Sequence, residues 1–196
     1  MITASGCIFL SIDTGRVMLQ QRSGEVNHPR TWGFFGGKAE GNERPVETLY
    51  REIEEEVGLV PSIEKVIPIN KFTSPNKKFI YHSFVVTVED EFIPVLNNES
   101  DGYCWVKIGN WPRPLHPGAK IQCGSKDFLK KVKSIHPNLT PNDLRLCAYL
   151  RLNLSSKEIA PLLNISARSV EIKRYRLRKK MELDHEQSLV EYILKI

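Results

Sequence analysis

A cluster of glutamates in the first third of the chain has the spacing of a metal site. Glu52, Glu55 and Glu56 follow one another at intervals of three and one residues, so on a helix of about 100° per residue they share one face. Like charges this close repel by a few tenths of a kcal/mol per pair, and a bound cation removes that cost. Carboxylates suit Mg²⁺ or Mn²⁺, which proteins commonly hold together with substrate phosphates. The pattern predicts a divalent metal acting on a pyrophosphate.

Residues typical of helix ends flank this cluster. Gly36 and Gly37 precede it, Pro45 stands near the first turn, and Gly58 follows it, which predicts where the helix begins and ends. We expect this helix to bury an apolar face opposite the acidic one. The residues expected on the buried face are Val46, Leu49, Tyr50, Ile53 and Val57. The alternative is an ordinary amphipathic helix whose glutamates are solvated.

The spacing from Gly37 to Leu59 is Gly-x5-Glu-x7-Arg-Glu-U-x-Glu-Glu-x-Gly-U, where U is aliphatic. It resembles the signature of the Nudix hydrolases and matches it at every position. The resemblance implies an α/β fold, a Nudix α/β/α sandwich with a mixed sheet, over roughly residues 1–120. It also implies hydrolysis of a nucleoside diphosphate derivative, with metal ions that clamp the substrate and acidify the attacking water.

The resemblance also implies roles for individual residues. The metal ligands would be Glu52, Glu55, Glu56 and the carbonyl oxygen of Gly36. Arg51 would orient a glutamate through a charge-assisted hydrogen bond. The general base would be either Glu52 or Glu99, although Glu99 could equally be a solvated acid in an exposed loop.

Residues outside the helix could contact the rest of the substrate. In this resemblance Arg22 and Lys38 would meet phosphate groups, although each could be a surface cation. Trp32, Phe34 and Tyr81 could stack on a base, but aromatic residues in strands more often belong to the core.

Strand patterns dominate the first two thirds of the 196-residue chain, and helical patterns follow the proline-rich segment 111–118. Strands are expected over 5–12, 17–22, 32–35, 60–72, 79–88 and 103–108. We expect a first domain over residues 1–122, a linker or terminal helix over 123–136, and a small all-α domain over 137–196. In the last domain Thr140, Ser155 and Asp184 are the expected helix caps, and 164–166 is an expected turn into a further helix.

A short helix, a tight turn and a longer basic helix form a helix-turn-helix, whose second helix can enter the major groove of DNA. The segment 168–180 holds seven lysines and arginines against one acid, which predicts a polyanionic partner. The strings Leu154-Ser-Ser-Lys-Glu-Ile-Ala160 and Asn164-Ile-Ser-Ala-Arg-Ser-Val170 resemble the LuxR/GerE family of DNA-binding domains. The alternative is a helical bundle with a solvated basic helix.

The LuxR/GerE resemblance implies double-stranded DNA as a partner and assigns contacts on the last basic helix. Glu171, Ile172 and Tyr175 would face base edges, while Lys173, Arg176 and Lys179 would lie near phosphates, which position a protein without reading sequence. Arg168 would point outward with them. Val170, Leu177 and Met181 form the expected buried stripe, and Arg174 departs from the usual apolar residue. Since such domains commonly act as dimers, we expect a homodimer.

Composition excludes several other classes of protein. The four cysteines form no CxxC pair, so neither a zinc site nor a disulfide framework is indicated. The longest apolar runs are shorter than the roughly 20 residues of a membrane span, and residues 1–6 lack the basic start of a signal peptide. We therefore expect a cytoplasmic protein with no membrane partner.

Three functional hypotheses remain open. The first is a Mg²⁺-dependent pyrophosphohydrolase with an attached DNA-binding domain. The second is a transcription regulator whose Nudix domain senses a nucleotide without turnover; the complete set of catalytic residues favours hydrolysis over this. The third is an artificial fusion, because Gly124-Ser125 resembles a cloning junction.

Overall fold

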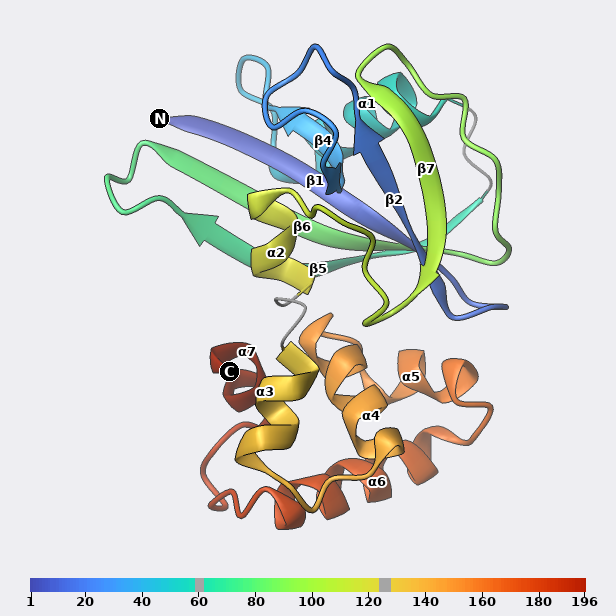
Figure 1. Cartoon of the computed structure of the whole chain (residues 1–196), viewed down its shortest axis with the longest axis vertical. Helices are drawn as coiled ribbons and strands as arrows, with labels where there is room; N and C mark the ends of the chain where they lie inside the picture. Colours follow the sequence, from blue (N-terminus) through green and yellow to red (C-terminus); the bar gives the residue numbers. More distant parts are fainter. Residues whose placement is uncertain (59–61, 124–127) are drawn as a thin grey trace. The chain divides into compact units, whose positions relative to one another are not determined.

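The computed structural model describes residues 1–58, 62–123 and 128–196 and divides the chain into two compact units (Figure 1). Unit 1 is Met1–Gln122 and unit 2 is Cys123–Ile196. Leu59 of the acidic motif and the Gly124–Ser125 pair lie outside the described residues. Across the described ranges, none of the helices combines the length and apolar character needed to cross a bilayer.

Unit 1 is built on one mixed sheet, which the described residues form from seven strands. Its elements are β1 (Ile2–Ser11), β2 (Arg16–Arg22), β3 (Trp32–Gly33), β4 (Phe35–Lys38), α1 (Pro45–Val57), β5 (Ile63–Thr73), β6 (Phe79–Val88), β7 (Ser100–Lys107) and α2 (Pro117–Cys123). The pairing of β1 with β6 is parallel and the other pairings are antiparallel. Helices α1 and α2 lie on opposite faces of the sheet (Figure 1). The predicted α/β fold with a mixed sheet is confirmed.

On one of its two sides, strand β1 changes its pairing partner halfway along its length. This change places the glycines that precede α1 against β1. Its first half pairs with β4, so Gly36 lies opposite Gly6, and its second half pairs with β2. Gly36 has a φ of +140°, and a Cβ on it would lie 2.2 Å from the carbonyl oxygen of Ser5. A side chain cannot fit there, so glycine is required for β4 to approach the sheet this closely.

Helix α1 turns two of its glutamates toward the sheet. Leu49, Ile53 and Val57 are buried in the core, as predicted. The prediction that Val46 and Tyr50 are buried is wrong, because they are 43% and 47% exposed. Glu52 and Glu56 are buried instead. The reason is that their part of the helix lies over Gly36 and Gly37, which leave room for carboxylates.

Unit 2 is helical. Its helices are α3 (Phe128–Ile135), α4 (Pro141–Arg151), α5 (Ser156–Leu162), α6 (Ala167–Lys180) and α7 (Leu189–Lys195). Helices α5 and α6 form the expected helix-turn-helix, and Val170, Leu177 and Met181 are buried as predicted.

Two of the three predicted helix caps, Thr140 and Ser155, are confirmed, and Ser166 is a further cap at the expected turn. The side chains of Thr140, Ser155 and Ser166 each accept a hydrogen bond from a backbone N–H in the first turn of α4, α5 and α6. The prediction for Asp184 is wrong, because Ser188 caps α7. The carbonyl of Asp184 instead accepts a hydrogen bond of 2.6 Å from the guanidinium of Arg178, so this segment is part of a loop.

Asp143 ties the start of α4 to the end of α6. Its Oδ2 accepts hydrogen bonds from the backbone N–H of Thr140 at 2.8 Å, from the Thr140 hydroxyl at 2.6 Å and from Lys180 Nζ at 2.6 Å. Burial opposes ionisation, but the bonds from Lys180 and Thr140 outweigh it and lower the pKa of Asp143.

We predict that Asp143→Ala lowers the free energy of unfolding by about 1 to 2 kcal/mol, because it removes half of a capping box and a partly buried ion pair. Urea denaturation followed by circular dichroism measures this. Because the pKa of Asp143 is lowered by folding, its contribution is present above the ordinary carboxyl pKa and is lost as the pH falls through the lowered value. Asp184→Ala, at an exposed loop residue, is the matched control. Equal stability of the two variants would contradict this role for Asp143.

Candidate active site

Glu56 is the most deeply buried acid of the cluster, with 2% of its surface exposed. Its Oε2 accepts hydrogen bonds from the Gly36 N–H at 2.6 Å and from Gln20 Nε2 at 3.2 Å. Its Oε1 is buried and has no hydrogen-bond partner among the described residues. Burial raises the pKa of this carboxyl to about 8, against the hydrogen bond from Gly36. An acid held this way has one oxygen free for a cation.

Glu52 lies one helical turn before Glu56 and covers Gly37. A Cβ on Gly37 would be 2.4 Å from Glu52 Oε1, so the absence of a side chain there makes room for the carboxylate. Burial raises the pKa of Glu52, against the attraction of Arg51, whose Nη1 lies 3.0 Å from Glu52 Oε1. The charge of Glu52 also raises the pKa of Glu56, so each carboxylate disfavours ionisation of the other.

Arg51 connects the remaining acids of the motif. Its Nε donates to Glu43 Oε1 at 2.8 Å, its Nη1 to Glu55 Oε2 at 3.0 Å, and its Nη2 to the Lys38 carbonyl at 2.8 Å. The hydrogen bond from Arg51 is the main cause that lowers the pKa of Glu43 to about 2. Arg51 therefore orients acids on both sides of it, and Glu43 stabilises the start of the helix.

These residues can be tested for their fit to a metal. Within the part of the chain that the structure describes, no three acidic, histidine or cysteine side chains converge as a ready-made metal site, because Glu55 turns toward Arg51. The chemistry of the donors nevertheless fits, since Glu56 has an unpartnered buried oxygen and Glu52 lies beside it above glycine. Hard oxygen donors of this kind suit Mg²⁺ or Mn²⁺.

Glu99 lies in the loop before β7, one residue ahead of that strand. Its carbonyl accepts a hydrogen bond from the Ser23 N–H at 2.8 Å, and its side chain is exposed. Its negative charge contributes to the raised pKa of both Glu52 and Glu56. Glu52 is part of the acidic cluster, whereas a role for Glu99 as the general base stays a prediction.

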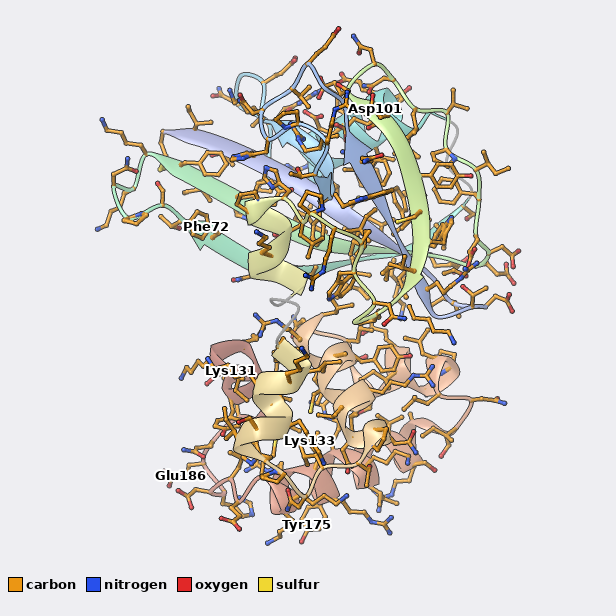
Figure 2. The ribbon with its side chains drawn as sticks, in the orientation of Figure 1. Phe72, Asp101, Lys131, Lys133, Tyr175 and Glu186 are labelled. Atoms are coloured by element: carbon orange, nitrogen blue, oxygen red, sulfur yellow. The ribbon has the colours of Figure 1, made fainter. Side chains whose placement is uncertain are left out.

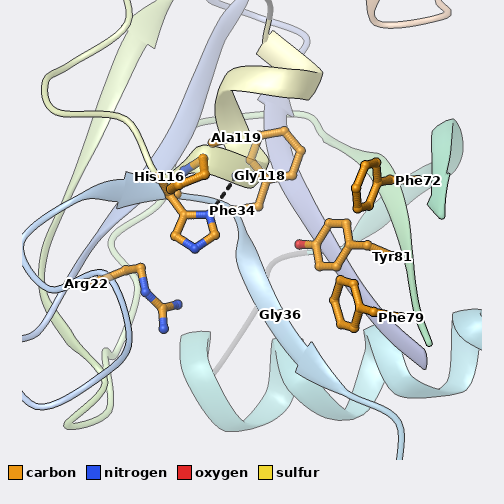
Figure 3. A pocket seen from close by; sticks show the side chains of 11 residues that line it. Arg22, Phe34, Gly36, Phe72, Phe79, Tyr81, His116, Gly118 and Ala119 are labelled. Carbon is orange, nitrogen blue, oxygen red and sulfur yellow. Dashed lines mark hydrogen bonds between the residues drawn. The ribbon is translucent and has the colours of Figure 1, made fainter. Parts of the chain in front are cut away.

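A pocket of about 320 Å³ meets the acidic site at Gly36. Figure 3 shows aromatic side chains from β5 and β6 along one wall, with His116 and Arg22 across from them. Its aromatic lining consists of Phe34, Phe72, Phe79 and Tyr81. Of the predicted contacts, Arg22, Phe34 and Tyr81 line the pocket, while Lys38 and Trp32 are not among the described residues that line it.

Three lining residues with ring side chains, Phe72, Phe79 and His116, escaped the sequence analysis. Phe72 and Phe79 end and begin neighbouring strands of a hairpin, so alternation along β5 and β6 could have placed them beside Tyr81. His116 stands in the proline-rich segment, and no spacing in the sequence points to it. The pairing of residues 114–116 with Trp32 brings it to the sheet.

In unit 2 the residues predicted to contact DNA are all exposed on α6. They are Arg168, Glu171, Ile172, Lys173, Tyr175, Arg176 and Lys179. Tyr175 is 60% exposed and points outward from the helix (Figure 2). Arg174 is half-buried, and its Nη1 lies 3.5 Å from the Ser156 hydroxyl on α5, so it connects the two helices.

Each of the two units contains a match to a known protein family. Residues 2–122 match the NUDIX domain, and residues 137–193 match the GerE family of bacterial regulatory proteins of the luxR type. An RNA pyrophosphohydrolase of Halorhodospira halophila is 47% identical over 55 residues, which are 28% of each chain. A dihydroneopterin triphosphate diphosphatase of Haemophilus influenzae is 34% identical over 109 residues, 48% of this chain and 66% of that one.

Among solved structures, a Nudix hydrolase from M. smegmatis has a TM-score of 0.51 at 20% identity, covering 71% of this chain and 88% of its own. At this identity the likeness concerns the fold. The NUDIX match covers more than half of the chain. The chain therefore belongs to the NUDIX family and carries a luxR-type helix-turn-helix domain after its NUDIX domain.

Proposed function

We propose that the protein is a Mg²⁺- or Mn²⁺-dependent hydrolase that cleaves a pyrophosphate bond in a nucleoside diphosphate derivative, and that its second unit binds double-stranded DNA. The observation that carries the first part is Glu56, a buried acid with one unpartnered oxygen that lies beside Glu52. It is hydrogen-bonded to Gly36, which lines the aromatic pocket. A cytoplasmic location is part of this proposal.

In this proposal the metal is held by Glu52, Glu55, Glu56 and the carbonyl of Gly36. When bound, such a metal neutralises phosphate charge and lowers the pKa of a water molecule. Glu55 reaches it by exchanging its contact with Arg51, which keeps its bond to Glu43. Glu52 or Glu99 accepts the proton of the attacking water. Arg22 and Lys38 bind phosphate oxygens.

The names of the relatives guide the choice of substrates. Both relatives are named for cleavage of a pyrophosphate linkage, one on RNA and one on a pterin triphosphate. The chain spans only 28% and 66% of the lengths of these relatives, and the substrate therefore has to be tested directly. A suitable test panel contains nucleoside triphosphates, dihydroneopterin triphosphate and a 5′-triphosphorylated RNA.

A nucleotide-sensing regulator without turnover is the second candidate, and the luxR-type domain favours it. The two candidates differ in a direct measurement. Release of phosphate or pyrophosphate from any member of the panel supports hydrolysis. Ligand-dependent DNA retention without any product supports sensing. The Gly124–Ser125 pair, on which an artificial fusion depends, lies outside the described residues.

We predict that Glu52→Gln and Glu56→Gln each lower turnover by about 10²- to 10⁴-fold, because each removes a metal ligand or the general base. Product release measured at saturating Mg²⁺ tests this. Glu54→Gln is the matched control, since Glu54 is on the same helix and exposed. Retention of full activity in Glu56→Gln would contradict the proposed metal site.

We predict that the metal-free protein loses stability as the pH rises from about 5 to 8. Folding raises the pKa of Glu56 from 4.5 to about 8, so in this range the folded state binds a proton that the unfolded state lacks. The free energy of unfolding then falls by up to about 1.4 kcal/mol per pH unit. Thermal denaturation across this range measures the effect.

Two comparisons assign this pH dependence to Glu56. Glu56→Gln should remove most of it, since the pKa of Glu52 is also raised, while Glu54→Gln should keep it. Millimolar Mg²⁺ should restore the stability of the wild type at pH 8 and leave Glu56→Gln unchanged. The same pH profile in wild type and Glu56→Gln would show that another group is responsible.

We predict that unit 2 binds duplex DNA through α6, as a homodimer, with an affinity that falls as salt rises. Arg176→Ala should reduce the slope of log affinity against log salt by about 0.9, because one phosphate contact is lost. Fluorescence anisotropy with random duplex DNA measures this. Lys195→Ala, which removes an equal charge from an exposed position on α7, should keep the wild-type slope. A slope that is the same for all three proteins would exclude Arg176 from the interface.

A further inference from the structure

His116 is fixed in the pocket wall at the start of α2. Its backbone N–H donates to the Trp32 carbonyl at 2.8 Å, and its own carbonyl accepts the first helical bond, from the Lys120 N–H, at 3.0 Å. Its side-chain Nδ1 accepts a hydrogen bond from the Gly118 N–H at 3.0 Å (Figure 3). The imidazole thus caps the helix, and its orientation follows from the fold rather than from any ligand.

This hydrogen bond determines which nitrogen carries the proton. A backbone N–H can only donate, so Nδ1 must be the acceptor and the proton of the neutral ring lies on Nε2. The ring of His28 packs edge-on against His116, with centroids 4.8 Å apart. Burial, followed by the charges of Arg22 and His28, lowers the pKa of His116 to about 4. At neutral pH the ring is uncharged and offers one N–H donor.

The wall across from His116 is flat and aromatic. Phe79 and Tyr81 are stacked with an interplanar angle of 25°, and Phe72 lies beside them on β5 (Figure 3). Aromatic faces favour a planar ring as their partner. A fixed donor that faces aromatic side chains favours a ligand with an acceptor, because a donor left unpaired on ligand binding costs free energy.

We propose that this pocket binds a planar heteroaromatic ring that carries a hydrogen-bond acceptor on its edge, and that His116 Nε2–H is the donor that selects this ring. The inference rests on the proposed function, in which the ring is the nucleoside part of the substrate. A neutral donor suits a neutral acceptor such as a ring nitrogen or an exocyclic carbonyl oxygen. The phosphates are then at the Gly36 end of the pocket, next to the acidic residues.

The test compares two triphosphates of the same shape. GTP has acceptors on its ring edge, whereas indole riboside triphosphate has a bicyclic ring of similar size without them. We expect wild-type kcat/KM to favour GTP by about tenfold. His116→Phe keeps an aromatic ring but loses the donor, so it should lower kcat/KM for GTP about tenfold and leave the indole compound unchanged. His116→Asn, whose amide can both accept from Gly118 and donate, should restore part of the preference.

Two results would overturn the inference. One is a wild type whose kcat/KM is the same for both compounds. The other is a His116→Phe variant whose kcat/KM falls equally for both compounds, as damage to α2 would cause. If the wild type hydrolyses neither compound, the proposed hydrolysis is decided by the other members of the substrate panel. Dissociation constants from calorimetry with the same compounds and variants then test His116 separately. A tenfold preference that disappears in His116→Phe supports the inference, and its absence from the wild type refutes it.

Discussion

The close approach of β4 to β1 is the constraint on which the candidate active site depends. It requires glycine at position 36, where a Cβ would overlap the carbonyl oxygen of Ser5. Because the turn into α1 is fixed at this point, the helix lies with Glu52 and Glu56 over a surface without side chains. Burying two acids is unfavourable unless hydrogen bonds or a cation compensate. The Gly36 N–H and Gln20 compensate one oxygen of Glu56, and the other remains for a cation.

Arg51 keeps the other acids of the motif from adding to the unfavourable free energy of burying charge. It lies between Glu43, Glu52 and Glu55 and forms contacts of 2.8 to 3.0 Å with each of them. These three acids thus have an arginine as their counter-ion, while the more deeply buried Glu56 has no ion pair with any described residue. This difference separates a residue that orients the site from one that is suited to hold a metal.

Much of this arrangement could be predicted from the sequence, because local rules determine it. Short-range signals determine where α1 begins and ends, near Pro45 and Gly58. They also determine the caps at Thr140, Ser155 and Ser166. The predictions from the sequence were wrong where tertiary contacts determine the local structure. Helical periodicity cannot show that Gly36 and Gly37 offer space for acids, so Tyr50 was expected inside and Glu56 outside. Asp184 is a good cap by type, but Arg178 holds its segment as a loop.

The pocket was harder to predict for the same reason. Phe72, Phe79 and Tyr81 are ordinary strand residues, and a binding surface results only because β5 and β6 pair in this register. His116 is brought to them by bonds between the proline-rich segment and Trp32. Its tautomer depends on a single backbone N–H, that of Gly118. The acids proposed to bind metal have a recognisable spacing because they share one helix. The residues that line the pocket come from separate elements and become visible only in the fold.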